Sequence, residues 1–310
     1  MQQKMAGSPR IFQLFYRIYF GFWIPVLAWA STWWPLSLMY WKARRIVMLP
    51  FFLLRSKYLR AVRGNYARIL ALDEDHPQVR RLAWQMGYEH AYHWIDFFRW
   101  SQLDPELLHA NIEAVEGEDN FSAARASGRG TLLLTAHMGN PEVGAVAMGR
   151  HFEPVHVLYW RDRFAVAEEF RNRLRARGNV RGIAVDASPF SVVPALRVLE
   201  AGGIAAAHGD RDFNDQGWPV EFFGAAAKFP PGPFLLAARA GALVLPTYFL
   251  VRRDRRFHVI YEPAISLGGG GTIEERARVA MRVWVGSLER RIREHPEQWY
   301  CFYPFWQVAS

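Results

Sequence analysis

A histidine and a glutamate that follow a short apolar run are the residues of this chain best suited to chemistry. The run Thr131–Thr135 is typical of a buried strand, and His137 comes two residues after it. Asn140 is a favourable helix N-cap and Pro141 suits the first helical position, so Glu142 falls in the first turn of a helix. Because a tight turn separates them, the side chains of His137 and Glu142 can approach each other.

This pair is suited to general acid–base catalysis. A carboxylate that accepts the imidazole N–H fixes the tautomer of the ring and raises its basicity, so the other nitrogen can take a proton from an attacking hydroxyl. In the structural alternative, Glu142 only complements the helix dipole and His137 is a buried, hydrogen-bonded histidine. No G-x-S-x-G motif occurs, and the single cysteine, Cys301, lies far along the chain, so we favour direct transfer without a covalent enzyme intermediate.

Short apolar runs alternate with helical segments in the part of the chain that holds this pair. The predicted strands are Thr131–Thr135, Val155–Tyr159, Gly182–Val185, Ile204–Ala207, Leu243–Phe249 and Phe257–Tyr261. The predicted helices are Ile46–Leu72, Pro77–Leu103, Pro141–His151, Arg163–Arg177, Pro189–Glu200, Pro233–Ala240 and Thr272–Glu294. The alternation predicts an α/β domain over residues 73–310, with a mixed or mostly parallel central sheet flanked by helices. His137 then lies at the carboxyl end of a strand, where open α/β sheets form ligand crevices.

Residues 1–72 form a basic, aromatic segment that we expect to anchor the chain to a membrane. This segment holds eleven Lys and Arg and no Asp or Glu, so it carries a charge of +11, whereas the whole chain carries +9 and the remainder is close to neutral at −2. Residues 18–41 contain no charge, a length that allows a membrane span, a re-entrant or interfacial helical hairpin, or a cleaved signal peptide, with kinks at Pro25 and Pro35. Clustered Lys, Arg, Trp and Tyr suit an anionic phospholipid surface, and this charge map argues against a nucleic-acid partner.

Several arginines are candidates for binding a phosphate group. Arg161 and Arg163 follow a predicted strand, and Arg211 follows another. Guanidinium groups bind phosphate with two parallel hydrogen bonds. Ordinary surface charge is the alternative for Arg161 and Arg163, and pairing with a neighbouring aspartate is the alternative for Arg211. A further group, Arg171, Arg173, Arg175 and Arg177, is either a solvated helix face or a docking face for an acidic carrier protein.

Two groups of histidines raise the question of a metal site. His90 and His93 have helical i, i+3 spacing, but no third ligand accompanies them, so we interpret them as packed histidines. His208 lies close to two aspartates, and a fourth ligand at suitable spacing is absent from the sequence. We therefore expect no metal.

Four ordered stretches resemble the bacterial lipid A biosynthesis acyltransferase family of the lysophospholipid acyltransferase superfamily. They are TLLLTAHMGNPE, LRVLEAGGIAAAHGDRDF, VEFFGAAAKFPPGPFLLAARAGALVLPTYF and REHPEQWYCFYPFW, and the similarity runs from YLRAVRGNYARIL to Trp306. The resemblance implies that His137 is the catalytic base and Glu142 its partner. It implies a reaction that moves a fatty acyl group from an acyl carrier protein or coenzyme A thioester to a hydroxyl or amine of a membrane lipid or glycolipid, with no cofactor beyond the acyl donor.

The resemblance also implies further substrate-binding residues. Asp210 matches the acidic position of a GD motif, Phe223 and Gly232 fall in the segment that shapes the acceptor and acyl site, and Asn140 is assigned to the same site. Lipid A enzymes usually carry Gln where this chain has Arg211, and the GDR form looks more like acyltransferases of glycolipid or aryl-polyene-type pathways. The expected location is the bacterial inner membrane, with the catalytic domain on the cytoplasmic side. A catalytically inert membrane-binding scaffold of the same fold is the alternative.

Overall fold

The centre of the molecule is an eight-stranded sheet. The computed structural model describes residues 26–54, 56–100, 102–151, 154–161, 165–185 and 188–306. The strand order is β1-β9-β8-β2-β5-β3-β4, and β10 pairs with β8. These strands are β1 (Ile112–Glu116), β2 (Thr131–Thr135), β3 (Val155–Tyr159), β4 (Val180–Ala184), β5 (Ile204–His208), β8 (Leu243–Val251), β9 (Phe257–Tyr261) and β10 (Ile265–Ser266). All pairs are parallel except those of β9 and β10 with β8. The predicted α/β class with a mostly parallel sheet is confirmed.

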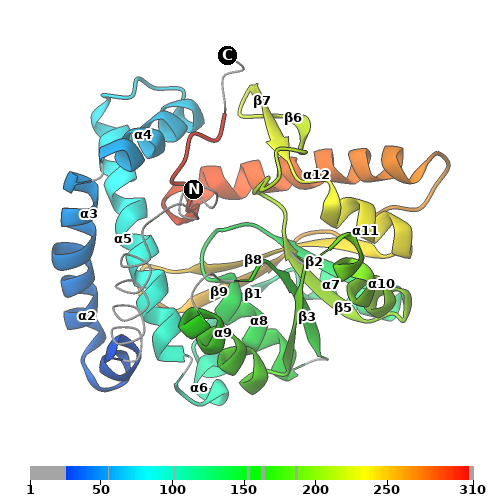
Figure 1. Cartoon of the computed structure of the whole chain (residues 1–310), viewed down its shortest axis with the longest axis horizontal. Coiled ribbons are helices and arrows are strands. Elements are labelled where there is room, and N and C mark those ends of the chain that lie inside the picture. Colours follow the sequence, from blue (N-terminus) through cyan, green and yellow to red (C-terminus); the bar gives the residue numbers. More distant parts are fainter. Residues whose placement is uncertain are drawn as a thin grey trace.

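Helices cover both faces of this sheet (Figure 1). One face carries α10 (Val193–Glu200), α11 (Gly232–Ala240) and α12 (Ile273–Glu294), and the other carries α6 (Pro105–Ala110), α7 (Glu118–Ala126), α8 (Pro141–His151) and α9 (Ala165–Arg177). Strand β2 contributes to both hydrophobic layers, because Leu132 and Leu134 pack with the first group and Leu133 packs with the second. Burial on both faces explains why this strand reads as a continuous apolar run.

The N-terminal helices pack beside the sheet domain. Residues 26–33 are helical, the helix stops at Trp34 and Pro35, and α2 (Leu36–Lys42) follows. The chain continues through η2 (Ala43–Met48), α3 (Leu49–Leu54), α4 (Ser56–Leu70) and α5 (Pro77–Trp100). Figure 1 shows α2 and α3 along the side of α5. Within the described residues, no helix has the length and apolar character needed to cross a bilayer. The start of the predicted apolar segment, residues 18–25, lies outside the described residues.

A partly buried ion-pair group fastens these helices to the sheet. Arg255, in the turn between β8 and β9, contacts Glu89 at 2.6 Å and also pairs with Asp96. The hydroxyl of Tyr40 donates a hydrogen bond to the same Asp96. Since Tyr40 belongs to α2 and both carboxylates belong to α5, one guanidinium group joins two helices to the sheet domain.

The structure differs from the sequence predictions at several element boundaries. Strand β4 begins at Val180 rather than Gly182, and the predicted helix over 189–200 is a 3-10 turn, η3 (Pro189–Val192), followed by α10. Arg163, the predicted start of α9, lies outside the described residues. The N-cap residue Thr272 precedes α12, where its side chain and that of Glu275 each accept a hydrogen bond from the other's backbone N–H.

A separate hairpin was not predicted. It consists of β6 (Trp218–Phe222) and β7 (Ala225–Phe229), which are antiparallel. The sequence concealed it because Pro219 and a run of three alanines are weak strand formers. The two-residue turn places Phe223 at φ 50° and Gly224 at φ 72°, as a tight hairpin turn with two left-handed residues requires.

Candidate active site

His137 and Asp210 meet at the carboxyl edge of the sheet. Strands β2 and β5 are parallel neighbours in which Thr135 pairs with His208, so the residues just beyond both strands lie side by side. The Oδ1 atom of Asp210 is 2.7 Å from Nδ1 of His137. Both carboxylate oxygens of Asp210 also accept from the backbone N–H of His137, at 3.1 Å. Because an ionised carboxylate only accepts, Nδ1 carries the ring proton and Nε2 is left as the proton acceptor.

The electrostatic setting favours the protonation states that a base needs. Burial and the charge of Arg211 lower the pKa of His137, and together they outweigh the opposite effect of Asp210. Burial alone would raise the pKa of Asp210, but His137 and Arg211 outweigh it and hold this pKa well below its usual range. The imidazole is therefore neutral and the carboxylate ionised near neutral pH. The His137 side chain is 25% exposed, so a substrate can reach it.

Glu142 makes its strongest contacts with α9. Its carboxylate accepts from Nη2 of Arg175 at 3.0 Å and 3.3 Å, and Arg171 lies at 3.6 Å. The imidazole hydrogen bond that the sequence analysis gave to Glu142 is thus made by Asp210. The reason is the pairing of β2 with β5, which brings Asp210 directly to the ring, whereas Glu142 starts a helix that packs beside α9. Glu142 remains close enough to raise the pKa of His137, and its role in the reaction stays a prediction.

Arg211 points to the segment after α12, which we call the C-terminal segment (residues 296–306). Its Nη2 donates to the carbonyl of Tyr300 at 2.6 Å. Within the part of the chain that the structure describes, Arg211 forms no ion pair with a carboxylate. Asp212 instead accepts backbone N–H groups of the following turn, including that of Gly217 at 2.7 Å. The structural alternative for Arg211, pairing with an aspartate, is therefore not what the structure shows.

The C-terminal segment pairs with the loop that carries His137. The N–H of Gly139 donates to the carbonyl of Gln298 at 3.0 Å, and the N–H of Tyr300 donates to the carbonyl of His137 at 2.9 Å. Met138 and Trp299 form the antiparallel bridge between these two bonds. The loop after β2 is thus held on one side by Asp210 and on the other by residues far along the chain.

Three more histidines surround the site. The ring of His208 stacks on that of His137, with centroids 4.3 Å apart. His93 places Nδ1 at 3.1 Å from the carbonyl of Gly139, and His90 packs against Tyr300. Burial lowers the pKa of His90 to about 3 and that of His93 to about 4, so both are neutral. Within the described residues, no group of three or more His, Cys, Asp or Glu is arranged to hold a metal ion.

The other predicted site residues lie apart from the pair of His137 and Asp210 or form hydrogen bonds to the backbone. Asn140 is buried, and its amide donates to the carbonyl of His93 at 3.3 Å. Its Oδ1 has no hydrogen-bond partner, so the expected side-chain cap of α8 does not form. Phe223 lies at the hairpin tip against Trp306, and Gly232 is the exposed first residue of α11. Arg161 is exposed after β3, and Arg163 lies outside the described residues.

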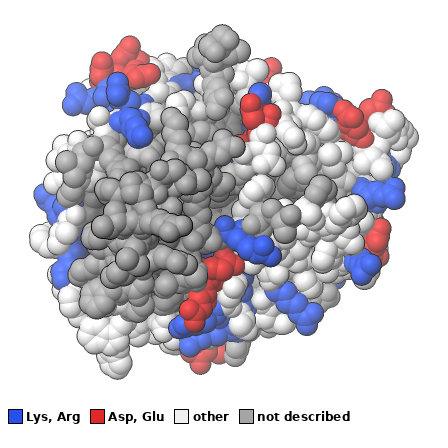
Figure 2. Space-filling view, in the orientation of Figure 1, with Lys and Arg blue, Asp and Glu red and all other residues white. Residues whose placement is uncertain are grey.

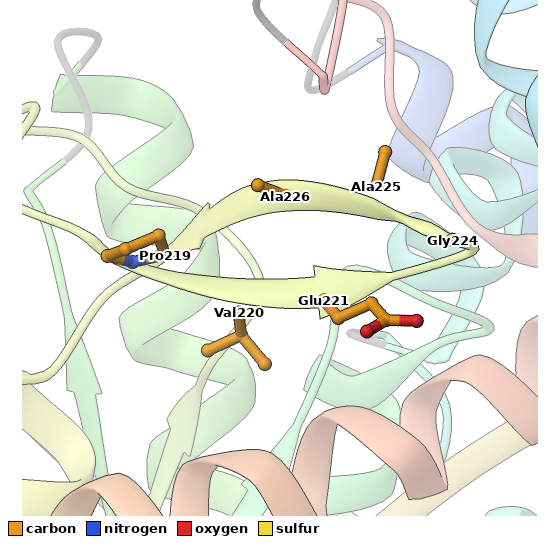
Figure 3. Close-up of a pocket in the computed structure, with 6 residues that line it drawn as sticks. All are labelled: Pro219, Val220, Glu221, Gly224, Ala225 and Ala226. Carbon is orange, nitrogen blue, oxygen red and sulfur yellow. The ribbon is translucent and has the colours of Figure 1, made fainter.

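A shallow hollow lies along the β6–β7 hairpin, and its lining does not include His137 or Asp210 (Figure 3). Its volume is about 360 Å³, and it is lined by Pro219, Val220, Glu221, Gly224, Ala225 and Ala226. Glu221 is the only ionisable residue in this lining, so the hollow offers no acid–base pair. We therefore place the candidate active site at His137 and Asp210.

Comparison with known families identifies the family of the chain. The family described as bacterial lipid A biosynthesis acyltransferase matches residues 12–308. The chain belongs to this family. It is an acyltransferase, and the resemblance drawn from four sequence stretches is confirmed.

The similar curated proteins are phosphatidylinositol mannoside acyltransferases. The protein of Mycolicibacterium smegmatis is 25% identical over 223 residues, which cover 70% of this chain and 69% of that protein. Two proteins from strains of Mycobacterium tuberculosis are 26% identical over 223 residues, which cover 69% of this chain and 66% of each of them.

Trp299, His208 and Arg175 were not among the site residues predicted from the sequence. Trp299 lies within one of the stretches that carried the resemblance, so a signal was present. Arg175 was grouped with a solvated helix face, yet it is only 2% exposed. Its burial was not predicted because it lies on a helix rich in charged residues, a pattern typical of a solvent-exposed face.

Proposed function

We propose that this acyltransferase moves a fatty acyl group from a thioester to a hydroxyl of a membrane lipid or glycolipid, with His137 as general base. The observation that carries the proposal is the 2.7 Å contact between Asp210 and Nδ1 of His137 in a member of this family. The donor we propose is acyl carrier protein or coenzyme A carrying the acyl chain. An amine acceptor uses the same steps.

The proposed reaction is one displacement at the thioester carbonyl. Nε2 of His137 takes the proton of the acceptor hydroxyl while its oxygen forms a bond to the carbonyl carbon. The ionised Asp210 stabilises the imidazolium that forms, as a buried carboxylate does beside a catalytic histidine. The tetrahedral intermediate then collapses, the C–S bond breaks, and the leaving thiolate takes the proton from His137. The products are an ester and a free thiol, and the base returns to its neutral state without a cofactor.

The acceptor class we favour is a lipid-linked sugar. The similar curated proteins are named for a phosphatidylinositol mannoside, which is such a molecule. Arg211 supports an acceptor that carries a phosphate, because its guanidinium has one backbone partner and no carboxylate partner among the described residues. An aryl-polyene-type or other acceptor is the second candidate, because the GDR form of the motif resembles enzymes of both glycolipid and aryl-polyene-type pathways.

We propose that the N-terminal helices hold the protein at the cytoplasmic side of a bacterial inner membrane. Trp29, Trp33 and Trp41 are exposed to 59%, 73% and 55% although tryptophan is usually buried. Arg44 and Arg45 are exposed on the adjoining helix. Aromatic and basic side chains together favour an interface with anionic phospholipid. On the face drawn in Figure 2, by contrast, the Lys and Arg over the sheet domain are interspersed with Asp and Glu.

Lipid extracts of cells that express the wild type or His137→Ala test the function. We expect a lipid heavier by one acyl group with the wild type alone, and its mass identifies both acceptor and chain length. His76→Ala is the matched control, because His76 is exposed and its ring contacts the backbone of Gln78. If the new lipid forms equally with folded His137→Ala, His137 is not the base. If no lipid changes and the purified wild type hydrolyses no acyl thioester in detergent, the inert scaffold is correct.

A further inference from the structure

The carboxylate of Asp210 is held by donors from two parts of the chain. Oδ1 faces Nδ1 of His137, and Oδ2 accepts a hydrogen bond from the indole Nε1 of Trp299 at 3.1 Å. Asp210 is 1% exposed, so water cannot replace a lost donor without opening the site. Oδ2 also accepts from the backbone N–H of His137 at 3.1 Å, so the indole is the one side-chain donor, among the described residues, that fixes the second oxygen of this carboxylate.

Trp299 is itself fixed by its surroundings. The side chain is 2% exposed, and its ring meets Phe305 at 5.0 Å and 73° and Phe222 at 6.0 Å and 77°. These steep angles are favourable edge-to-face contacts. The preceding residue, Gln298, binds both backbone groups of Val251 through its side-chain amide, at 2.9 Å and 2.8 Å. The indole cannot turn away unless the aromatic cluster and β8 also move.

A second buried tryptophan shows what a purely structural indole does here. Trp284 of α12 is fully buried, and its Nε1 donates at 3.1 Å to the backbone carbonyl of Leu134. That bond satisfies a polar group in the core and touches no ionisable side chain. Trp299 differs because its N–H points at a carboxylate that binds the proposed base.

We infer that Trp299 is a positioning residue of acyl transfer: its indole N–H locks the Asp210 carboxylate in the orientation that holds His137. The inference rests on the proposed function. It extends the pair of His137 and Asp210 to a third member that acts through Asp210 and does not touch the substrate. The C-terminal segment thereby becomes part of the active site.

The inference predicts a change in the pH dependence of the reaction. A carboxylate that loses a donor keeps more of its negative charge, so Asp210 would stabilise the imidazolium more strongly and the pKa of His137 would rise. The other charged and titratable groups that face His137 are Arg211, His208, Glu142, His93 and His90. None of these five donates to Asp210 Oδ2 in the structure, so replacing Trp299 leaves their contacts in place.

The test compares Trp299→Phe with Trp284→Phe in the full-length protein. For Trp299→Phe we expect kcat to fall roughly ten- to hundredfold, the range for loss of a hydrogen bond to a charged group. We also expect the acid limb of kcat/KM to move up by about half a pH unit or more. Trp284→Phe loses an indole bond of equal length and should lower stability without moving the acid limb. If the Trp299→Phe variant does not fold, replacing Trp299 with β-(3-benzothienyl)alanine gives the same test, because this residue keeps the ring shape and lacks the N–H.

A double variant separates positioning from packing. In an Asp210→Asn background the indole has no carboxylate to orient, so adding Trp299→Phe should cost less than threefold in kcat. An unmoved acid limb in the folded Trp299 variants, or costs that multiply fully in the double variant, overturns the inference. The proposed function is tested separately by His137→Ala. If that folded variant keeps wild-type activity, His137 is not the base and the proposed function fails. If His137→Ala loses activity but the Trp299 variants keep the wild-type kcat and acid limb, only the positioning role of Trp299 is refuted.

Discussion

Glu142 on α8 forms an ion pair with Arg175 on α9, whose side chain is only 3% exposed. The Nε and Nη1 atoms of Arg175 are buried without hydrogen-bond partners, and its guanidinium lies 4.2 Å from the centre of the Tyr159 ring. Glu142 is thus the principal charge that balances a buried cation beneath the active-site edge. An H-x-x-x-x-E spacing can therefore combine two tasks, with the histidine in the reaction and the glutamate in the support of the neighbouring helix.

Glu142→Gln should therefore destabilise the protein as well as slow it. Removing one partner of a buried ion pair costs roughly 3 kcal/mol, because the remaining charge is left without compensation. We expect a lower midpoint in urea unfolding with an unchanged slope. Glu169→Gln is a matched control, since Glu169 pairs with Arg173 at the surface of the same helix and such pairs contribute about 1 kcal/mol or less. Equal stability of the two variants would show that Arg175 does not depend on Glu142.

His137→Ala and Asp210→Asn should both abolish most of the transfer while leaving the fold intact. Loss of the general base costs about 10²–10⁴-fold in rate. Asparagine at position 210 can donate to Nδ1, which favours the wrong tautomer, and the comparable change in serine proteases costs about 10⁴-fold. Thiol release from an acyl thioester in the presence of acceptor lipid measures both rates. Asp212→Asn is the control, since Asp212 accepts backbone N–H groups of its own turn. A fall of equal size in Asp212→Asn would mean that the local turn, not the dyad, controls the rate.

The rate should depend on pH through the neutral form of His137. Because burial and Arg211 lower its pKa below the ordinary 6.5, kcat/KM should rise with pH, and the midpoint of this rise should lie below pH 6.5. A plateau that begins well above pH 7 would contradict the charge distribution around the dyad. Arg211→Lys should keep most of the lowering of the His137 pKa, because the positive charge remains. Arg211→Gln should move the acid limb to higher pH, because the positive charge that opposes protonation of His137 is lost.

Stability should fall as the solution is acidified from about pH 6.5 to pH 4. In the folded state burial lowers the pKa of His90 to about 3 and that of His93 to about 4, whereas both have the ordinary value of 6.5 when unfolded. The unfolded chain therefore binds more protons in this interval, so the free energy of unfolding decreases as the pH drops. Urea titrations at several pH values measure the slope. In His90→Phe the free energy of unfolding should fall less steeply as the pH drops. A wild-type dependence on pH in that variant would show that other groups cause the loss of stability.

Exposed tryptophans of the N-terminal helices should govern vesicle binding. Replacing Trp33 and Trp41 with Ser removes two large apolar side chains from the exposed surface and should weaken binding to anionic vesicles by about tenfold or more. The matched control replaces Val279 and Val283, which are each 52% exposed on α12, and should leave binding unchanged. Co-sedimentation with vesicles that contain phosphatidylglycerol gives the partition constants. Equal losses in both pairs would argue against a specific membrane face.

The sequence predicted most of the sheet because its parallel strands are buried on both faces. Strands β2, β3 and β9 match their predicted bounds, since unbroken runs such as Thr131–Thr135 carry a strong local signal. The β6–β7 hairpin was not predicted because its alanines give only a weak local signal for a strand. Placing Asp210 against His137 required the knowledge that β2 and β5 are neighbours, which no local pattern encodes. The same holds for Trp299, whose contact with Asp210 joins residues 89 positions apart.

The pairing of the His137 loop with residues 298–300 has a consequence for protein synthesis. Strand β2 and its loop leave the ribosome well before Trp299 has been translated, so the emerging chain exposes His137 without the indole and backbone bonds that hold it. The nascent protein should therefore remain unable to transfer acyl groups until the C-terminal segment folds back onto the sheet. Proteolytic removal of that segment would return a mature enzyme to the same idle condition.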